Sequence, residues 1–212
     1  DLVRDYGCDS LRMYELFVGP PELDAEWDDR GIDGVNRFLK RLWNLLMDSK
    51  EHEVKATKEM IKQRNRLICD ITTRLESFSL NTVISGFMEY NNKFIEIAKK
   101  EGGVDKETLE TIAVLLSPLA PHFAEEMWEQ LGHTETIFKA KWPTYDESQM
   151  KDDEIEVAVQ INGKTKSIIT IAADIDKDAA IAAGKDAVAG KLTGTIVKEI
   201  YVPGRIINIV QK

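Results

Sequence analysis

The sequence is poor in cysteine and has no long apolar run, and each absence excludes a class of protein. Its two cysteines, Cys8 and Cys69, lie far apart among 212 residues and lack CxxC spacing, which argues against a disulfide framework or a zinc site. We expect both side chains to be small buried residues. No apolar run reaches about eighteen residues and no basic segment precedes an apolar one at the start, so we expect neither a membrane span nor a secretory signal. The expectation is a cytoplasmic protein without membrane contact.

The motifs of covalent, metal and phosphate chemistry are missing as well. The sequence contains no GxSxG nucleophile motif, no HExxH zinc motif, and neither a GxxxxGK[ST] nor a GxGxxG phosphate-binding loop. Three carboxylates in a row, at residues 152–154, are interpreted as solvated linker residues rather than metal ligands. We therefore predict no catalytic residue, no metal site and no cofactor within this chain.

One stretch does look like a reaction centre. In "LLSPLAPHFAEEMWEQLG", residues 115–132, His122 and Glu126 are four residues apart and meet on one face of a helix, as a general base and its orienting carboxylate would. A hydrolase is the function that this pair suggests. We favour a structural role, because Pro118 and Pro121 mark a helix junction and one of them fits a first helical turn. The apolar residues around the pair form a core-facing stripe: Leu119, Phe123, Met127, Trp128 and Leu131.

Charge is distributed unevenly. The net charge is -9, which by itself disfavours a nucleic-acid partner. Residues 154–212, however, carry eight Lys or Arg against seven Asp or Glu, a net of +1, so residues 1–153 carry -10. Within the acidic part, residues 36–75 hold ten Lys or Arg and five Asp or Glu, a net of +5. This basic stripe has two interpretations, a solvated helix face and an RNA contact.

Hydrophobic periodicity predicts an antiparallel helical bundle up to about residue 150. The first amphipathic segment leaves Arg37, Lys40 and Arg41 on its polar side. Its core-facing side is predicted to hold Val35, Phe38, Leu39, Leu42, Trp43 and Leu46. Asp105 is a plausible N-cap, and Gly102-Gly103 is a helix stop. The bundle is predicted from four or five segments with short links: residues 31–49, 56–78, 79–100, 105–116 and 115–132.

From residue 154 the period changes from helix to strand. Residues 154–161 alternate strictly, Asn162-Gly163 is a strong hairpin signal, and residues 164–171 return from it. An alanine-rich helix follows over about residues 177–192, and a second hairpin turns at Pro203-Gly204. The order ββαββ predicts a small α+β domain after an all-α bundle, so the fold class is multidomain.

Four stretches of this sequence resemble the C-terminal part of bacterial-type leucyl-tRNA synthetases, a family of class I enzymes. "YGCDSLRMYELFVGP", at residues 6–20, is similar to the segment that follows the family's KMSKS loop. Trp27 with "GVNRFLKRLWNL" and the stretch at 115–132 with Trp142-Pro143 resemble the anticodon-binding helical bundle. "VQINGKTKSIITI" and "YVPGRIINIV" resemble the small terminal domain. The sequence departs from the family pattern at three positions: Cys8 stands where alanine is usual, and Lys166 and Ser167 stand where arginine and glycine are expected. Lysine keeps the charge of arginine but loses its bidentate phosphate geometry.

The resemblance implies a division of labour. Residues 1–30 would be the tail of the catalytic core, 31–150 the anticodon-binding-type bundle and 154–212 a tRNA-binding domain. The chain starts without methionine and lacks HIGH and KMSKS motifs, so we expect a fragment that cannot aminoacylate alone. ATP and Mg²⁺ are implied only for the full-length enzyme. The implied partners are tRNA-Leu and the missing catalytic and editing domains of the same polypeptide, and we expect a monomer.

Charge and turn placement single out individual RNA-contact candidates. They are Arg37, Arg41, Lys62 and Arg66 in the bundle, and Lys164, Lys166, Lys198 and Arg205 in the terminal domain. The implied function is to position tRNA-Leu for aminoacylation by a catalytic domain outside this chain. Two alternatives stay open: the C-terminal part of another class Ia aminoacyl-tRNA synthetase, and a helical protein-interaction scaffold without enzymatic function.

Overall fold

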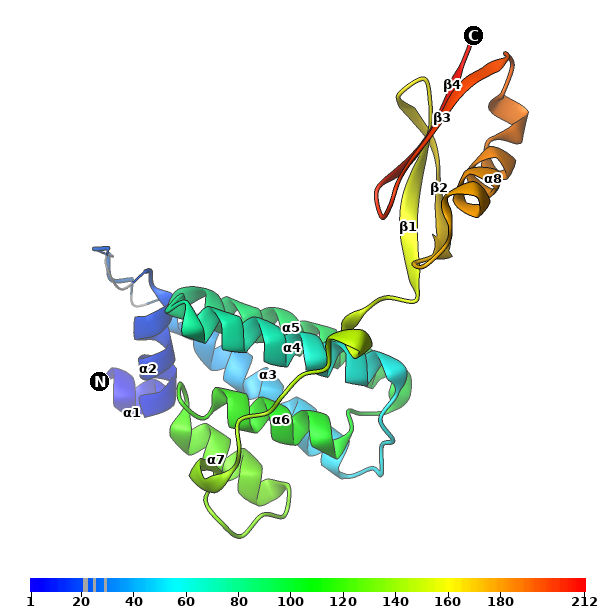
Figure 1. Ribbon diagram of the computed structural model, residues 1–212. Helices are drawn as coiled ribbons and strands as arrows, with labels where there is room; N and C mark the ends of the chain where they lie inside the picture. Colours follow the sequence, from blue (N-terminus) through cyan, green and yellow to red (C-terminus); the bar gives the residue numbers. More distant parts are fainter. Residues whose placement is uncertain (21–22, 25, 29) are drawn as a thin grey trace. The chain divides into compact units, whose positions relative to one another are not determined.

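The structure is a computed structural model that describes residues 1–20, 23–24, 26–28 and 30–212. The chain divides into two compact units, Asp1–Met150 and Lys151–Lys212 (Figure 1). The first unit is helical and the second combines a sheet with a helix. This confirms the predicted fold class, a helical bundle followed by a small α+β domain. None of the described helices has the length and hydropathy that a membrane crossing requires.

The first unit is built from helices joined by short connections. Helices α1 and α2 lie within the region that we assigned to the tail of a catalytic core, and α2 packs against α3 and α5 of the bundle. The described part of this unit contains seven α-helices: α1 (Leu2–Tyr6), α2 (Cys8–Phe17), α3 (Ile32–Lys50), α4 (Lys58–Glu76), α5 (Leu80–Glu101), α6 (Lys106–Leu116) and α7 (Pro121–Gln130). Two short 3₁₀ helices follow, η1 (Ile137–Lys139) and η2 (Glu147–Met150).

Local capping explains where these helices begin and end. The Thr57 side chain accepts a hydrogen bond from the Met60 amide at the start of α4, and Asp105 accepts one from the Thr108 amide at 3.1 Å at the start of α6. Gly102 ends α5 with a φ of +80°, a left-handed conformation that glycine adopts at little cost. The predicted cap and stop signals are therefore confirmed.

The core of the first unit lies between α3, α4, α5 and α6, with α2 and α7 packed on its sides. The apolar face predicted for the first segment is buried, except that Trp43 is only half-buried. One ion pair is enclosed with this core: Arg64 donates to Asp105 at 3.1 Å, and both side chains are at most 10% exposed. On α5, burial together with the nearby Asp70 raises the pKa of Tyr90 to about 12.

A segment at the end of the first unit runs along α4, and we call residues 142–150 the strap. Trp142 donates from its indole Nε1 to Thr72 Oγ1 at 2.9 Å, and the Asp146 amide donates to Asn65 Oδ1 at 2.7 Å. At the end of the strap, Arg66 Nε donates to the Met150 carbonyl at 2.7 Å. The strap is thus held by three side chains of one helix, Thr72 near its end and the adjacent Asn65 and Arg66, before the chain enters the second unit.

The second unit has the predicted ββαββ order. Its elements are β1 (Glu154–Ile161), β2 (Lys164–Ala172), α8 (Lys177–Ala187), the 3₁₀ helix η3 (Ala189–Lys191), β3 (Ile196–Val202) and β4 (Ile206–Gln211). Asn162 and Gly163 form the first hairpin turn with φ values of +49° and +78°. The Asp176 carboxylate caps α8 by accepting from the amides of Asp178 and Ala179, each at 2.9 Å.

The strand order adds a feature that the sequence did not predict. The sheet runs β2-β1-β4-β3, so the two hairpins are joined by a parallel pairing of β1 with β4. Local alternation predicts strands and hairpins but not which hairpin edges meet. Helix α8 covers one face closely, because a Cβ added to Gly184 would lie 2.8 Å from Ile207. Ile207 therefore points toward α8, and Ile206 points to the opposite face.

The two cysteines differ from the expectation of burial. Cys8 is exposed and Cys69 is half-buried. Cys8 is the first residue of α2, where Asp9 and Ser10 rather than Cys8 turn inward. The prediction was wrong because residue type alone does not set the rotation of a helix.

Candidate nucleic-acid interface

The exposed side of α3 presents three cations and one amide in a row. We call Arg37, Lys40, Arg41 and Asn44 the α3 ridge. All four side chains are exposed. No carboxylate in the described parts of the chain forms an ion pair with the three cations. Glu96 is the acidic neighbour of Arg41, but it accepts from Lys99 at 2.6 Å; that pair, with a smaller contribution from Arg41, lowers the pKa of Glu96. The ridge is therefore a row of three cations whose acidic neighbours are Glu96, which is paired with Lys99, and the exposed Asp48, which lines the same hollow as Arg41 and Asn44.

The cations that were predicted on α4 have different surroundings. Lys62 pairs with Glu59 and is only 18% exposed, and Arg66 is half-buried and bound to the Met150 carbonyl. Arg64, another member of the basic stripe, is buried against Asp105. The stripe that is continuous in sequence is therefore divided in space. Arg37 and Arg41 are presented to solvent, whereas Lys62 and Arg66 are engaged within the unit.

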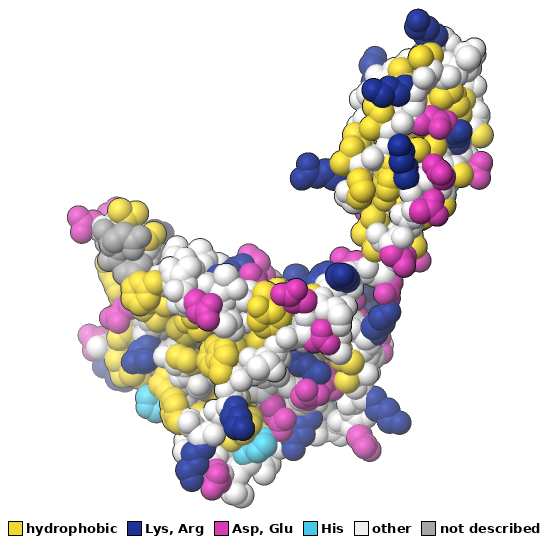
Figure 2. Space-filling view, viewed as in Figure 1, with side chains coloured by type: hydrophobic (Ala, Val, Ile, Leu, Met, Phe, Trp, Pro, Cys, Tyr) yellow, Lys and Arg dark blue, Asp and Glu magenta, His cyan; other side chains and the backbone are white. Residues whose placement is uncertain are grey.

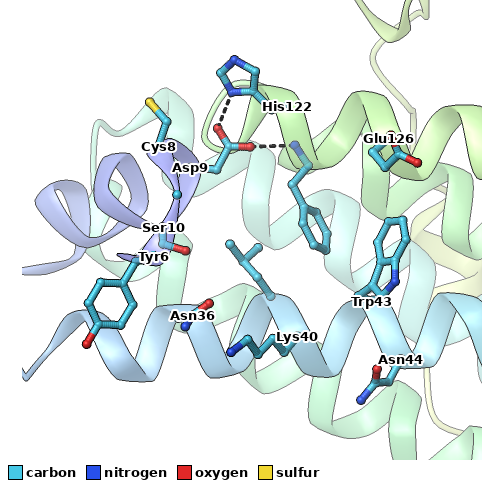
Figure 3. Close-up of a pocket in the computed structure, with 13 residues that line it drawn as sticks. Tyr6, Cys8, Asp9, Ser10, Asn36, Lys40, Trp43, Asn44, His122 and Glu126 are labelled. Atoms are coloured by element: carbon cyan, nitrogen blue, oxygen red, sulfur yellow. Dashed lines mark hydrogen bonds and ion pairs between the residues drawn. The ribbon is translucent and has the colours of Figure 1, made fainter. Parts of the chain in front are cut away.

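The stretch with His122 is a junction between distant parts of the chain (Figure 3). Asp9, on α2, accepts a hydrogen bond from the Phe123 amide at 2.6 Å through Oδ2, and its Oδ1 lies 2.9 Å from His122 Nδ1. Phe123 is in the first turn of α7, where backbone amides lack helical acceptors. Arg12 adds a bond to the Pro118 carbonyl at 3.3 Å. Pro121 occupies the first turn, as predicted.

This geometry replaces the acid–base pair that the sequence suggested. The partner of His122 is Asp9, not Glu126, whose carboxylate accepts from Gln130 at 2.9 Å. Glu125 binds the Ile137 amide at 3.1 Å and thereby holds η1. These carboxylates are used in helix capping and loop attachment. The arrangement does not form the hydrolase pair.

A pocket lies beside the α3 ridge, between α2, α3 and α7, and we call it the α3 pocket. Its volume is about 490 Å³. Leu39, Trp43 and Phe123 form its apolar wall, with the Trp43 and Phe123 rings edge to face at 5.8 Å. Asn36, Lys40 and Asn44 stand along α3 on one side, and His122 and Glu126 stand on α7 on the other (Figure 3). Sequence reasoning missed the pocket, since Trp43 was expected in the core.

In the second unit the predicted cations lie around the edge of the sheet. Lys164 follows the first hairpin turn, and Lys198 lies near the same end because it pairs with Val210, one residue beyond the Ile161 level. Arg205 lies at the second turn, at the opposite end of the sheet. Lys164, Lys166, Lys198 and Arg205 are all exposed. They surround the sheet rather than forming one cluster; Figure 2 shows Lys and Arg side chains spread among hydrophobic ones on the visible face of this unit.

The sheet face opposite α8 carries an apolar row. Register pairs align Ile168, Ala158, Ile206 and Val202 across the four strands. Ile168 is 65% exposed and Val202 37%. This row was not predicted, although the consecutive isoleucines of "RIINIV" place one apolar residue on each face and were a usable signal.

The helical bundle, its exposed cationic ridge and the attached α+β unit define a class of protein. The chain belongs to the family described as the anticodon-binding domain of tRNA ligases, whose model matches residues 57–181. The match extends from α4 through the strap into the second unit. It thus includes part of the terminal domain in addition to most of the bundle.

The particular relatives that the chain resembles are leucine–tRNA ligases. It is 42% identical over its whole length to that of Fervidobacterium nodosum and 41% identical over 99% of its length to that of Phocaeicola vulgatus. The chain spans 28% and 22% of these two proteins. It also matches a crystal structure of the ternary complex of Agrobacterium radiobacter K84 agnB2 LeuRS with tRNA and LeuAMS, with a TM-score of 0.78 at 26% identity over 99% of this chain and 29% of that one. The resemblance inferred from the motifs is confirmed.

Proposed function

We propose that this chain is the tRNA-binding part of a leucine–tRNA ligase and positions tRNA-Leu for a catalytic region that lies outside it. The observation that carries the proposal is the match to leucine–tRNA ligases along essentially the entire chain, second unit included. A solved relative that contains tRNA supports the choice of partner. The proposal includes ATP and Mg²⁺ for the complete enzyme, its catalytic and editing domains as covalent partners, a monomeric state and a cytoplasmic location.

Positioning is the mechanism that the residues support. The α3 ridge offers cations without internal partners at about one-turn spacing on a rigid helix, and such cations follow a phosphate backbone. The second unit offers Lys164, Lys166, Lys198 and Arg205 around a small sheet, which suits contact with RNA shape. We propose that residues 1–30 connect this assembly to the catalytic core. Two rigid units that hold one RNA reduce the orientational freedom of its reactive end.

The alternatives differ in what they require of the surface. A protein-interaction scaffold needs an apolar partner face rather than unpaired cations. Another class Ia synthetase is disfavoured by the relatives, which are leucine–tRNA ligases for the second unit as well. Among the candidates, we give most weight to Arg37 and Arg41 in the bundle, because Lys62 and Arg66 would have to leave existing partners to bind phosphate.

The test is the salt dependence of tRNA binding. The dissociation constant of the 212-residue chain for a tRNA-Leu transcript is measured across a series of KCl concentrations. We expect the logarithm of the association constant, the reciprocal of this value, to fall linearly with the logarithm of the salt concentration. Arg37→Gln and Arg41→Gln should each reduce the magnitude of the slope by about one. The matched control is Lys139→Gln, since Lys139 is exposed but already paired with Glu135 at 3.2 Å; its slope should equal that of the unchanged protein.

Two results would contradict the proposal. Binding that is absent at low salt, or that ignores salt, removes the RNA function for this chain. Equal competition by tRNA-Val and tRNA-Ile would favour a general class Ia role over one directed to tRNA-Leu.

A further inference from the structure

The α3 pocket combines an aromatic wall with a polar rim. Trp43 and Phe123 are half-buried and held edge to face, so each presents part of its ring to the cavity. The volume, about 490 Å³, lies in the range of sites that enclose small organic groups, roughly 300 to 1,000 Å³. Aromatic walls of this kind are the platforms on which unpaired bases stack.

The rim supplies hydrogen-bonding groups of both kinds. The Asn36 and Asn44 amides can donate and accept, and Lys40 donates. The Asp9 Oδ1 atom lies 2.9 Å from His122 Nδ1, which leaves Nε2 as the other ring nitrogen available for a hydrogen bond. The His122 side chain is 76% exposed, and within the described part of the chain its Nε2 has no hydrogen-bond partner. Hydrogen-bonding groups from α3 and α7 thus lie along the rim of the pocket, outside the aromatic wall (Figure 3).

The cations beside the pocket, rather than its lining, favour an RNA occupant. The lining holds two carboxylates, Asp9 and Glu126, which accept from the Phe123 amide and from Gln130, and one cation, Lys40. Lys40 lies on the rim, and Arg37 and Arg41 of the same α3 ridge lie next to it along the helix. Nucleotides whose phosphates bind along that ridge lie at the mouth of the pocket.

We propose that the α3 pocket takes one unpaired nucleobase of the bound tRNA, which stacks on Trp43 and Phe123 while Lys40 and the ridge hold the flanking phosphates. The inference rests on the proposed function and names a contact within it. An apolar side chain from another protein segment is the competing occupant. It would fill the wall but leave Asn36, Asn44 and His122 covered without partners, which is unfavourable.

Trp43→Leu tests the stacking surface directly. It should weaken binding of a tRNA-Leu transcript by roughly 5- to 150-fold, the range that corresponds to loss of one base–aromatic stack. Because no charge is removed, the salt slope should not change, in contrast to Arg41→Gln. The matched control is Trp128→Leu, since Trp128 is also half-buried on the first unit but stacks on His133 and does not line the pocket.

A second variant and a second measurement make the test independent of folding. Asn36→Phe fills the mouth while keeping Trp43 and should cause a similar loss, with the thermal midpoint of each variant checked by circular dichroism. Base-selective chemical probing of the transcript should show one nucleotide protected by the unchanged chain and reactive with Trp43→Leu.

The outcomes separate the two proposals. Salt-dependent tRNA binding that Trp43→Leu and Asn36→Phe leave intact, with no base losing protection, overturns the nucleobase pocket and leaves the tRNA function standing. That pattern would assign the pocket to a protein segment. No tRNA binding by the unchanged chain overturns both.

Discussion

At the scale of single residues, Asp9 contributes more to holding helix α7 than His122 does. Its side chain is only 9% exposed and satisfies an amide in the first turn of α7, a helix that begins more than a hundred residues later. The carboxylate also faces the N-terminal end of the helix, where negative charge is stabilising. His122 is mostly exposed, and its bond to Asp9 is open to water. The stretch that suggested catalysis is thus the start of helix α7, and Asp9 caps that helix from a distant part of the chain.

The Asp9 cap predicts unequal losses of stability. Asp9→Ala should lower the free energy of unfolding of the helical unit by about 1 to 3 kcal/mol, since the Phe123 amide loses its acceptor in a partly buried site. His122→Ala should change it by less than about 1 kcal/mol, because an exposed ionic contact contributes little. Urea unfolding followed by circular dichroism at 222 nm measures both. Equal losses for the two variants would contradict this assignment.

At the scale of elements, α4 connects the core of the bundle to the strap. Its apolar side packs on α5, and its other side receives the strap through Thr72, Asn65 and Arg66. Cys69 lies on that second side as well, and its hydrogen bond with Tyr145 raises the pKa of the Tyr145 phenol. Because the strap ends at Met150, the last residue of the first unit, α4 holds the end of that unit in place.

Asn65 should be the main attachment of the strap. It is 6% exposed, accepts from the Asp146 amide, and donates to the Ile61 carbonyl and to Gln149. Asn65→Ala should lower the free energy of unfolding by about 1 to 3 kcal/mol and speed tryptic cleavage after Lys141 and Lys151.

The comparison variant for this prediction is Thr72→Val, which removes only the bond to the half-exposed Trp142 indole. It should cost less than about 1 kcal/mol and leave the cleavage rate nearly unchanged. Cleavage that is faster in Thr72→Val than in Asn65→Ala would show that the strap is held by its indole instead.

At the scale of the whole molecule, charge and compactness separate the two units. Residues 1–150 carry a net charge of -9 and residues 151–212 a net charge of zero. An acidic unit can still bind RNA if its cations are gathered on one surface, and the α3 ridge gathers three of them along one helix. The second unit has its own small core of strand and α8 residues, distinct from the core of the bundle.

Separate cores predict that the second unit can be removed without unfolding the first. A chain ending at Met150 should keep the thermal midpoint of the helical unit, measured at 222 nm, because all of its core residues remain. Its tRNA salt slope should fall by up to about four, one for each of Lys164, Lys166, Lys198 and Arg205 that contacts phosphate. Loss of helicity on truncation would refute the independence of the units, and an unchanged slope would remove these four residues from the interface.

The sequence by itself determined the elements, their order and the family. The cap at Asp105, the stop at Gly102 and the Asn162-Gly163 turn act on a few neighbouring residues, so they are readable without a structure. The motifs at 6–20 and 115–132 indicated the family for the same reason, since each is a short contiguous pattern.

Only the tertiary structure decided how those elements pair and pack against one another. It paired Asp9 with α7, joined β1 to β4 in parallel, divided the basic stripe into a free ridge and an engaged part, and opened the α3 pocket beside Trp43. Periodicity tells which face of an element avoids water, but not which surface covers it. The partner of Asp9 and the exposure of Trp43 depend on packing between residues far apart in the chain, and no local pattern records it.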